Sequence, residues 1–357
     1  MASKDAAANE ASMSVGDGRA LPGSSAAPKA MVSLRAVEVA DYPAVAELHN
    51  RVNSSASPVS AEMIAHFVRT GDPDRPMRQV VAEEAEEPVG LGVLGASRVS
   101  PASTLIIAVE EPYRRRGIGT ALLAWLAAGL DSPRLVSASV SEDCPAGIAF
   151  AQRQAFEERS RVFPSVLDLN RFEPRRFARH RDAAERAGIR FTTFAEVDSA
   201  EMRHKIHALQ TACEADVPTP ERLKPRTFPD WEEACLHAPW FRPDLLVLAL
   251  AEDLPVALSY LSMKPGGGGY NWFTGVAADN RGHGLGTAIK VELLGRAKAA
   301  GIREVSTDNH SKNAAILAVN ERLGYEPQPG VIEFMGTLAP RSLTTRGPGA
   351  SDISKRR

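Results

Sequence analysis

The 357-residue sequence predicts an α/β protein made of two copies of one domain. The length favours two hydrophobic cores, since one core rarely grows beyond ~250 to 300 residues. Segments that alternate like strands are interleaved with segments of helical spacing in both halves of the chain. The motif Arg-x-x-Gly-x-Gly-Thr begins at Arg114 and again at Arg281, 167 residues later. That period is too long for a solenoid, so it indicates a duplicated domain.

The first half shows one order of elements. The segment MVSLRAVEVAD alternates like a strand, YPAVAELHNRVN has apolar residues at helical spacing, and STLIIAVEE is a continuous apolar run. The expected elements are a strand in 31–41, a helix in 42–53, two strands across an acidic turn in 78–97, a strand in 103–111, a helix in 113–130, a strand in 133–142, a helix in 146–158 and a strand in 159–169.

The second half repeats that order, with Asp198 placed as Asp41 is in the first half. The expected elements are a strand and helix in 189–215, a strand pair in 244–263, a strand, glycine turn and helix in 270–301, a strand in 302–309, a helix in 311–326 and a strand in 331–338. We therefore expect domains at 31–170 and 189–338, joined by a mostly polar, partly helical linker at 171–188.

The remaining segments and the composition limit the function classes. Residues 1–30 and 339–357 lack a sustained apolar pattern and are expected to be disordered tails. A net charge of −2 argues against nucleic acid as the main partner. Three cysteines without a Cys-x-x-Cys spacing predict neither a disulfide framework nor a metal site. No apolar run reaches the ~20 residues of a membrane span, so we expect a soluble cytoplasmic protein with no membrane partner.

The glycine turns predict a phosphate-binding site. A strand-to-helix turn directs unpaired N–H groups and the positive end of the helix dipole at one point, and glycine leaves that backbone open to a ligand. The arginine adds a charge-assisted contact. A Walker A loop would need Gly-Lys-Ser/Thr, and a dinucleotide fingerprint would need a small residue where Leu122 and Ile289 stand. The alternative is that each turn is only a tight connection.

At these residues the sequence resembles the GNAT superfamily of acetyl-CoA-dependent N-acetyltransferases. Its pyrophosphate motif, Arg/Gln-x-x-Gly-x-Gly/Ala, follows the fourth strand and opens the third helix. The resemblance spans roughly 31–170 and 189–338 and implies, in each copy, a mixed, mostly antiparallel twisted sheet flanked by helices. It implies acetyl-CoA as cosubstrate and coenzyme contacts at Thr274, Val276, Arg281, Gly282, His283, Gly284, Leu285, Gly286, Thr287, Asn309, Asn313 and Asn320, and in the first copy at Val109, Arg114, Arg115, Arg116, Gly117, Ile118, Gly119 and Thr120.

The resemblance is fuller in the second copy. Thr307-Asp308-Asn309, Asn313, Asn320 and Leu323-Gly324-Tyr325 follow in the family's order, whereas the first copy has Cys144 or Ala146 and Ala155 at the corresponding places. This implies that the second copy is catalytic and that the first either binds a second coenzyme A or acts as scaffold. A turn or helix-cap role is the alternative for Asn309 and Asn313.

The sequence identifies the catalytic acid and base less clearly than the coenzyme-binding residues. Asn320 stands where many family members carry a tyrosine acid, and the strand 270–276 has no carboxylate. The acceptor wall of the family corresponds to residues 211–234, where Asp216 is the preferred base with Glu214 behind it. The alternative for Asp216 is a helix-ending residue before Val217-Pro218. Trp231, Trp240 and Trp272 are expected either to line this pocket or to belong to the core.

These features predict acetyl transfer from acetyl-CoA to a primary amine of a small molecule. Two-domain relatives acetylate a mycothiol precursor or kasugamycin-type aminoglycosides, and acidic residues at the acceptor wall favour an aminoglycoside 2'-amine and a role in antibiotic resistance. A mycothiol precursor and peptide or protein N-termini are the alternative acceptors. A non-catalytic coenzyme A sensor or scaffold is the competing class. The oligomeric state stays open.

Overall fold

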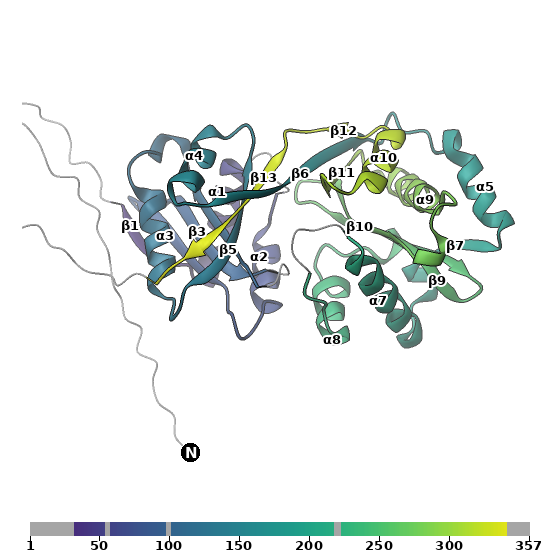
Figure 1. Ribbon diagram of the computed structural model, residues 1–357, viewed down its shortest axis with the longest axis horizontal. Helices are drawn as coiled ribbons and strands as arrows, with labels where there is room; N and C mark the ends of the chain where they lie inside the picture. Colours follow the sequence, from purple (N-terminus) through teal and green to yellow (C-terminus); the bar gives the residue numbers. More distant parts are fainter. Residues whose placement is uncertain (1–31, 54–57, 98–100, 218–222, 341–357) are drawn as a thin grey trace, which may run out of the picture.

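The structure is a computed structural model that describes residues 32–53, 58–97, 101–217 and 223–340. The tails expected at 1–30 and over most of 339–357 lie outside these ranges. Figure 1 shows two α/β halves side by side, connected by long strands that pass from one half into the other. No helix in the described ranges is both long and apolar enough to cross a bilayer.

The first half of the chain forms the elements that its patterns predict, plus one that the sequence analysis did not anticipate. Its strands are β1 (Ser33–Ala36), β2 (Arg78–Glu84), β3 (Glu87–Ala96), β4 (Ser103–Val109), β5 (Arg134–Ser141) and β6 (Glu157–Asp168). Its helices are α1 (Tyr42–Val52), α2 (Ala61–Arg69), α3 (Ile118–Ala128) and α4 (Pro145–Arg153). The unanticipated helix is α2, which Ser60 caps by accepting a hydrogen bond from the Met63 N–H at 3.2 Å.

The second half repeats the pattern after a linker that contains α5 (Ala178–Arg186). Its strands are β7 (Ile189–Thr193), β8 (Leu246–Ala251), β9 (Leu254–Met263), β10 (Gly269–Val276), β11 (Glu304–His310), the short β12 (Glu326–Pro327) and β13 (Val331–Leu338). Its helices are α6 (Phe194–Val197), α7 (Ala200–Ala215), α8 (Phe228–Trp231), α9 (Leu285–Ala299) and α10 (Ala314–Leu323), with a π-helical turn at Glu232–Leu236. The strand expected at 331–338 coincides with β13.

The two copies exchange their last strands. Among the described residues, thirteen strands form one sheet in the order β1-β2-β3-β4-β5-β13-β6-β11-β10-β9-β8-β7, with β12 paired to β6. Thus β6, from the first half, pairs with β11, and β13, from the second half, pairs with β5. The exchanged strands also pair with each other at the centre. Each half of the sheet therefore contains a strand from the other of the sequence ranges 31–170 and 189–338.

Each hydrophobic core likewise contains residues from both halves of the chain. Ile332, Phe334 and Leu338 of β13 pack with α3 in the core of the first half. Leu167 of β6 packs with α9 in the core of the second half. On the opposite face of the sheet, α1 and α2 cover the first half and α7 and α8 cover the second. Each half consequently obtains part of its apolar burial from the other half's chain segment.

Removing the Phe334 ring tests the exchange. Phe334 is 3% exposed, so Phe334→Ala is expected to lower the free energy of unfolding by about 3–5 kcal/mol. Hydrogen exchange should show lost protection in α3 and β5, because the ring lies in the first half's core. The control is Phe163→Ala on β6, whose side chain is 36% exposed, and it should cost less than half as much. Loss of protection confined to β7–β11 would contradict the exchange.

Candidate functional site

Each copy contains a parallel strand pair that separates after two residues. The ladder between β4 and β5 consists of Ser103↔Val136 and Thr104↔Ser137. The ladder between β10 and β11 consists of Gly269↔Val305 and Tyr270↔Ser306. Beyond these pairs the strands diverge, which leaves main-chain groups along both inner edges of a V-shaped opening. The same opening therefore occurs twice in the chain.

A glycine turn follows the divergent strand in both copies. Gly117 (φ 86°) precedes α3 and Gly284 (φ 81°) precedes α9, both in the left-handed conformation. Two residues earlier, Arg115 (φ 64°) and Gly282 (φ 82°) adopt the same conformation, so the two turns share one backbone path. The first N–H groups of α3 and α9 have no partner within their helices, and this end of each helix attracts anions.

The motif arginines fasten these turns to the preceding strands. Nε–H of Arg114 donates to the Val109 carbonyl at 3.0 Å, and Nε–H of Arg281 donates to the Val276 carbonyl at 2.9 Å. The five-residue spacing from valine to arginine thus has a structural reason in both copies. The motif predicts that these arginines contact phosphate, and the structure adds this bracing role.

The two carboxylates proposed from the sequence lie at the C-terminal end of α7. Asp216 follows α7 and accepts a hydrogen bond from the Arg281 guanidinium at 2.7 Å. Glu214 accepts from Gln210 at 2.8 Å, and Gln210 in turn accepts from the Trp231 indole N–H at 3.0 Å. Trp231 is buried in the core. In this arrangement Asp216 orders the arginine of the turn, and Glu214 belongs to a network that orients a core tryptophan.

The opening of the first copy holds a pocket of about 620 Å³. Gly117, Gly119 and Ile107 line it together with Phe150 of α4. The other sequence-predicted residues that line it are Val109, Arg114, Arg115, Ile118 and Thr120. Arg116 instead pairs with Glu84, and its guanidinium lies 5.1 Å from the ring centre of Tyr113. The first copy thus presents a hollow, lined by its glycine turn, that is large enough for an extended ligand arm.

A larger groove of about 1010 Å³ lies over the exchanged strands. Tyr270 and Trp272 of β10 and Asp308 of β11 line its second-copy side. The Tyr270 hydroxyl donates to the Asp308 carboxylate at 2.9 Å. Asp308 is open to solvent within the groove, but the surrounding walls raise its pKa above the usual aspartate range. The sequence analysis did not identify this pair.

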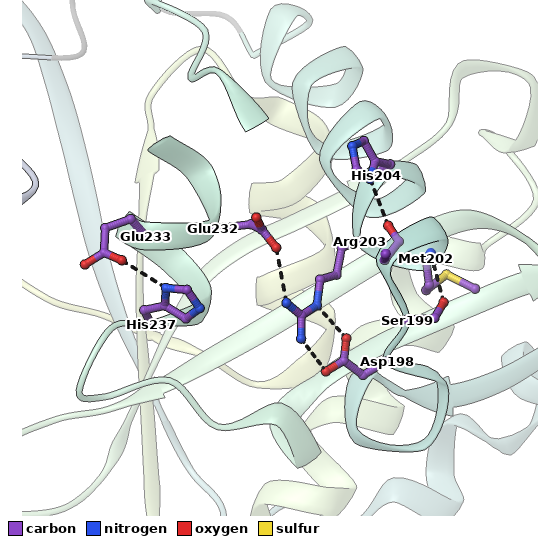
Figure 2. Close-up of polar contacts among 9 residues, drawn as sticks. Asp198, Ser199, Met202, Arg203, His204, Glu232, Glu233 and His237 are labelled. Carbon is purple, nitrogen blue, oxygen red and sulfur yellow. Dashed lines mark hydrogen bonds and ion pairs between the residues drawn. The ribbon is translucent and has the colours of Figure 1, made fainter. Parts of the chain in front are cut away.

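Direct contacts join α2 of the first copy to the π-helical turn of the second. His66 of α2 contacts the Ala234 carbonyl at 3.3 Å, and Arg69 pairs with Glu233 at 3.2 Å. Figure 2 shows that Glu233 also contacts His237 and that Arg203 of α7 bridges Asp198 and Glu232. These bonds hold the π-helical turn against both α7 and α2. Trp240 packs against Phe67 with 5.2 Å between ring centres, so it contributes to this contact.

Comparisons with known proteins agree with the duplicated fold. The family model for an acetyltransferase (GNAT) domain matches residues 76–158. The tandem GNAT protein of the clavulanic acid biosynthesis pathway superposes with a TM-score of 0.66 at 20% identity, over 87% of this chain and 99% of that protein. A GCN5-related N-acetyltransferase from Sphaerobacter thermophilus gives a TM-score of 0.64 at 17% identity, over 87% and 96%.

Two curated relatives cover most of the chain. The mycothiol acetyltransferase of Parafrankia sp. (strain EAN1pec) is 27% identical over 84% of this chain and 96% of its own length. That of Clavibacter michiganensis subsp. michiganensis (strain NCPPB 382) is 29% identical over 71% of this chain and 78% of its own length. Residues 76–158 thus match a GNAT acetyltransferase domain, and the chain as a whole is similar to tandem-domain GNAT proteins and to mycothiol acetyltransferases. The fold class expected from the sequence is confirmed.

The structure places further sequence-predicted residues of the second copy around its glycine turn. Leu285 and Thr287 are buried in the first turn of α9, and His283 is exposed with Nδ1 2.8 Å from the Arg281 carbonyl. A Cβ on Gly284 would lie 2.9 Å from Nδ1 of His180, so linker helix α5 reaches this turn. A Cβ on Gly286 would instead lie near Val276, at the mouth of the opening. Thr274 lies on the divergent part of β10 and bonds to Ser259 at 2.8 Å.

The three asparagines occupy different environments. Asn309 is buried on β11, and its Nδ2 has no hydrogen-bond partner among the described residues. Asn313 caps α10 by accepting from the Ile316 N–H at 3.4 Å, which matches the alternative reading of this residue. Asn320 is buried and accepts from Lys290 at 2.7 Å. The Nδ2 atom of Asn320 also has no hydrogen-bond partner among the described residues.

Lys290 and Asn320 form a buried cluster with Tyr325. The Lys290 ammonium lies 4.8 Å from the centre of the Tyr325 ring, and both side chains are buried. Burial lowers the pKa of Lys290 to about 7 and raises the pKa of Tyr325. Asn320 therefore hydrogen-bonds a buried lysine, and its side chain is too deeply buried for the contact with coenzyme A that the sequence predicted.

Lys290 makes stability depend on pH in an alkaline window. An unfolded lysine has a pKa of about 10.4, so between pH 7 and 10 the unfolded chain binds a proton that the native chain does not. Wild-type stability relative to Lys290→Met should then rise with pH by up to about 1.4 kcal/mol per unit. Urea unfolding at pH 7.5, 8.5 and 9.5 measures this difference. As a control, Lys312→Met at an exposed position should show the same pH dependence of the free energy of unfolding as wild type. A difference between wild type and Lys290→Met that does not change with pH would refute the assignment.

Proposed function

We propose that the second copy transfers acetyl from acetyl-CoA to the primary amine of a small molecule, and that the acceptor is a mycothiol precursor, an aminosugar linked to cysteine. The two mycothiol acetyltransferases support this acceptor because their similarity extends across both copies. The glycine turn supports the cosubstrate, since it sets unpaired N–H groups beside the V-shaped opening where a diphosphate would bind.

The observation that carries the assignment to the second copy is a bulge in β10. The ladder between β9 and β10 shifts register between Asn271 and Phe273, close to where β10 leaves β11. In the first copy, β3 and β4 stay in register from Gly90↔Val109 to Ala96↔Ser103. A bulge turns main-chain groups out of the ladder, and such groups can point at a ligand. The second copy therefore has the backbone irregularity suited to binding a reacting carbonyl.

The proposed reaction is direct transfer. The neutral amine attacks the thioester carbonyl, and N–H groups of the divergent part of β10, between Phe273 and Val276, stabilise the oxyanion that forms. The intermediate collapses by breaking the carbon–sulfur bond, which releases the coenzyme A thiolate and the acetylated amine. The amine nitrogen loses one proton to a base, and the thiolate gains one proton from the solvent or an acid. Holding both reactants in the opening supplies the positioning.

Kasugamycin-type aminoglycosides are the second acceptor class. The carboxylates Asp308, Glu304 and Glu333 line the central groove and would attract a molecule with several ammonium groups. Asp216, the base expected from the sequence, is instead paired with Arg281, so its carboxylate is not free to bind an ammonium group of the acceptor. Peptide N-termini are a third class, and a coenzyme A sensor without turnover is the competing function.

A matched pair of glycine substitutions tests which copy is catalytic. Gly286 and Gly119 occupy the same motif position, and a Cβ at either would make only ordinary contacts of 3.4 Å or more. A glutamate at position 286 brings a negative charge to the proposed diphosphate site, so Gly286→Glu should lower turnover at least about 100-fold. Gly119→Glu should reduce the coenzyme A stoichiometry in calorimetry while turnover continues. Loss of turnover in Gly119→Glu alone would assign catalysis to the first copy.

An acceptor panel tests the substrate class. Thiol release from acetyl-CoA should be fastest with the mycothiol precursor and slower with aminoglycosides, polyamines and peptides, because the relatives that cover both copies are mycothiol acetyltransferases. Mass spectrometry of the acceptor distinguishes transfer from hydrolysis of acetyl-CoA. Faster turnover of an aminoglycoside would select the second class, and tight coenzyme binding without turnover on any amine would favour the sensor.

A further inference from the structure

We infer that the acceptor amine binds in the central groove between the two copies and that Asp308 takes the proton from its ammonium group. The groove is the cavity of about 1010 Å³ over the exchanged strands. This inference rests on the proposed acetyl transfer by the second copy. It assigns the base and the acceptor site, neither of which follows from the glycine turn.

The groove lies beside the opening of the second copy. Tyr270 is the last residue of β10 that pairs with β11, and the Trp272 ring packs against it in the groove, with 4.8 Å between ring centres. Ser306, Asp308 and His310 of β11 line the same groove. An amine held at Asp308 is therefore next to the point where the two strands separate and where the thioester would enter.

The surroundings of Asp308 suit a base. Tyr270 donates to one carboxylate oxygen, Oδ2, at 2.9 Å and fixes the orientation of the group. The other oxygen, Oδ1, is the atom that we assign to the ammonium group. Groove walls raise the pKa of Asp308, while the Tyr270 hydrogen bond and the charge of Lys264 oppose that rise. The carboxylate is thus a stronger base than an ordinary aspartate and is still reachable from solvent.

Other charged groups in the groove are partly paired with one another. Lys264 forms an ion pair with Glu304 at 3.1 Å, and Glu333 accepts a hydrogen bond from Ser160. His310 of β11 and Arg159 of β6 complete the titratable groups that line the groove with Asp308 and Tyr270. Among them, Asp308 combines a carboxylate with a fixed orientation beside the strand opening.

The first copy forms the opposite wall. Met63 and Phe67 of α2, Ser137 and Ser139 of β5 and the exchanged strand β13 line the groove there. Figure 1 shows α2 and α8 facing each other on one side of the crossing strands. The His66–Ala234 and Arg69–Glu233 contacts hold α2 in this position. An acceptor whose amine reaches Asp308 would consequently contact residues of both copies.

The lining indicates a hydroxyl-rich amine with a ring. Serine hydroxyls from two strands, β5 and β11, offer donors and acceptors along the groove, at Ser137, Ser139 and Ser306. Trp272 is 45% exposed and is held by its indole N–H on Ser262 at 2.5 Å, so its ring face is available to a sugar. Aromatic faces and hydroxyl partners together suit an aminosugar better than a flexible polyamine, which would need mainly carboxylates.

In the proposed step, one proton of the bound ammonium moves to Oδ1 of Asp308. The freed nitrogen lone pair forms the new bond to the acetyl carbon, and the carbon–sulfur bond breaks to release the thiolate. The second proton lost from nitrogen passes to solvent or to the thiolate, and Asp308 returns its proton to water. Each acetyl transfer thus leaves the enzyme in its starting protonation state.

Asp308→Asn tests the base. The turnover of wild-type enzyme with the best acceptor should fall at low pH as Asp308 becomes protonated, and Asp308→Asn should lower turnover by about 100-fold or more and abolish that acidic limb. Tyr270→Phe should move the limb to higher pH, because the hydrogen bond that favours the carboxylate is lost. His310→Gln should retain the limb. An unchanged pH profile in Asp308→Asn would overturn the inference.

A serine-to-tryptophan pair tests the shared wall. Ser137→Trp would fill the groove from the first copy, so the KM for the acceptor should rise at least about tenfold while calorimetric coenzyme A binding stays unchanged. The control is Ser33→Trp, at an exposed position of β1 outside the groove, which should leave both values as in wild type. Thermal unfolding of both variants checks the fold. Equal acceptor KM values in the two variants would overturn the shared site.

These outcomes separate the two proposals. If the wild-type protein binds no coenzyme A or acetylates no amine, the proposed function fails. If wild type acetylates its acceptor and binds coenzyme A while Asp308→Asn and Ser137→Trp behave as wild type, only the central-groove inference fails.

Discussion

The strand exchange is the constraint on which the rest of the structure depends. Because β6 pairs with β11 and β13 pairs with β5, neither half completes its sheet without the other. The ladder between β6 and β13 then fixes the distance between the two V-shaped openings. It also supplies the floor of the central groove, so the proposed acceptor site exists only when the two copies are assembled.

The sequence predicts the elements well and their partners less well. Each strand and helix has a local pattern, and residues 331–338 form β13 as their alternation predicts. The partner of β13 is set by a strand almost 200 residues earlier, and no local pattern specifies whether that strand belongs to the same copy. The sequence patterns above do not include helix α2, although its face against α1 is apolar, because the repeated glycine motif lies outside residues 61–69.

The candidate site likewise contains features that the local sequence predicts and features that depend on the tertiary fold. The glycine turns are local features, since their positive φ angles and the valine–arginine brace lie within nine residues of sequence. Asp308 and Tyr270 are brought together only by the parallel register of β10 and β11, which places residues 38 positions apart in contact. The pairing of Asp216 with Arg281 likewise depends on where α7 ends relative to the turn.

The exchanged strands have a consequence for how such a chain could arise. A single-copy protein with the same elements could form this sheet by associating as a dimer whose subunits swap their final strands. In that sense the present chain is a dimer made covalent by residues 171–188. Joining the subunits removes the requirement that they be identical, so one half is free to specialise in chemistry while the other keeps the shared architecture intact.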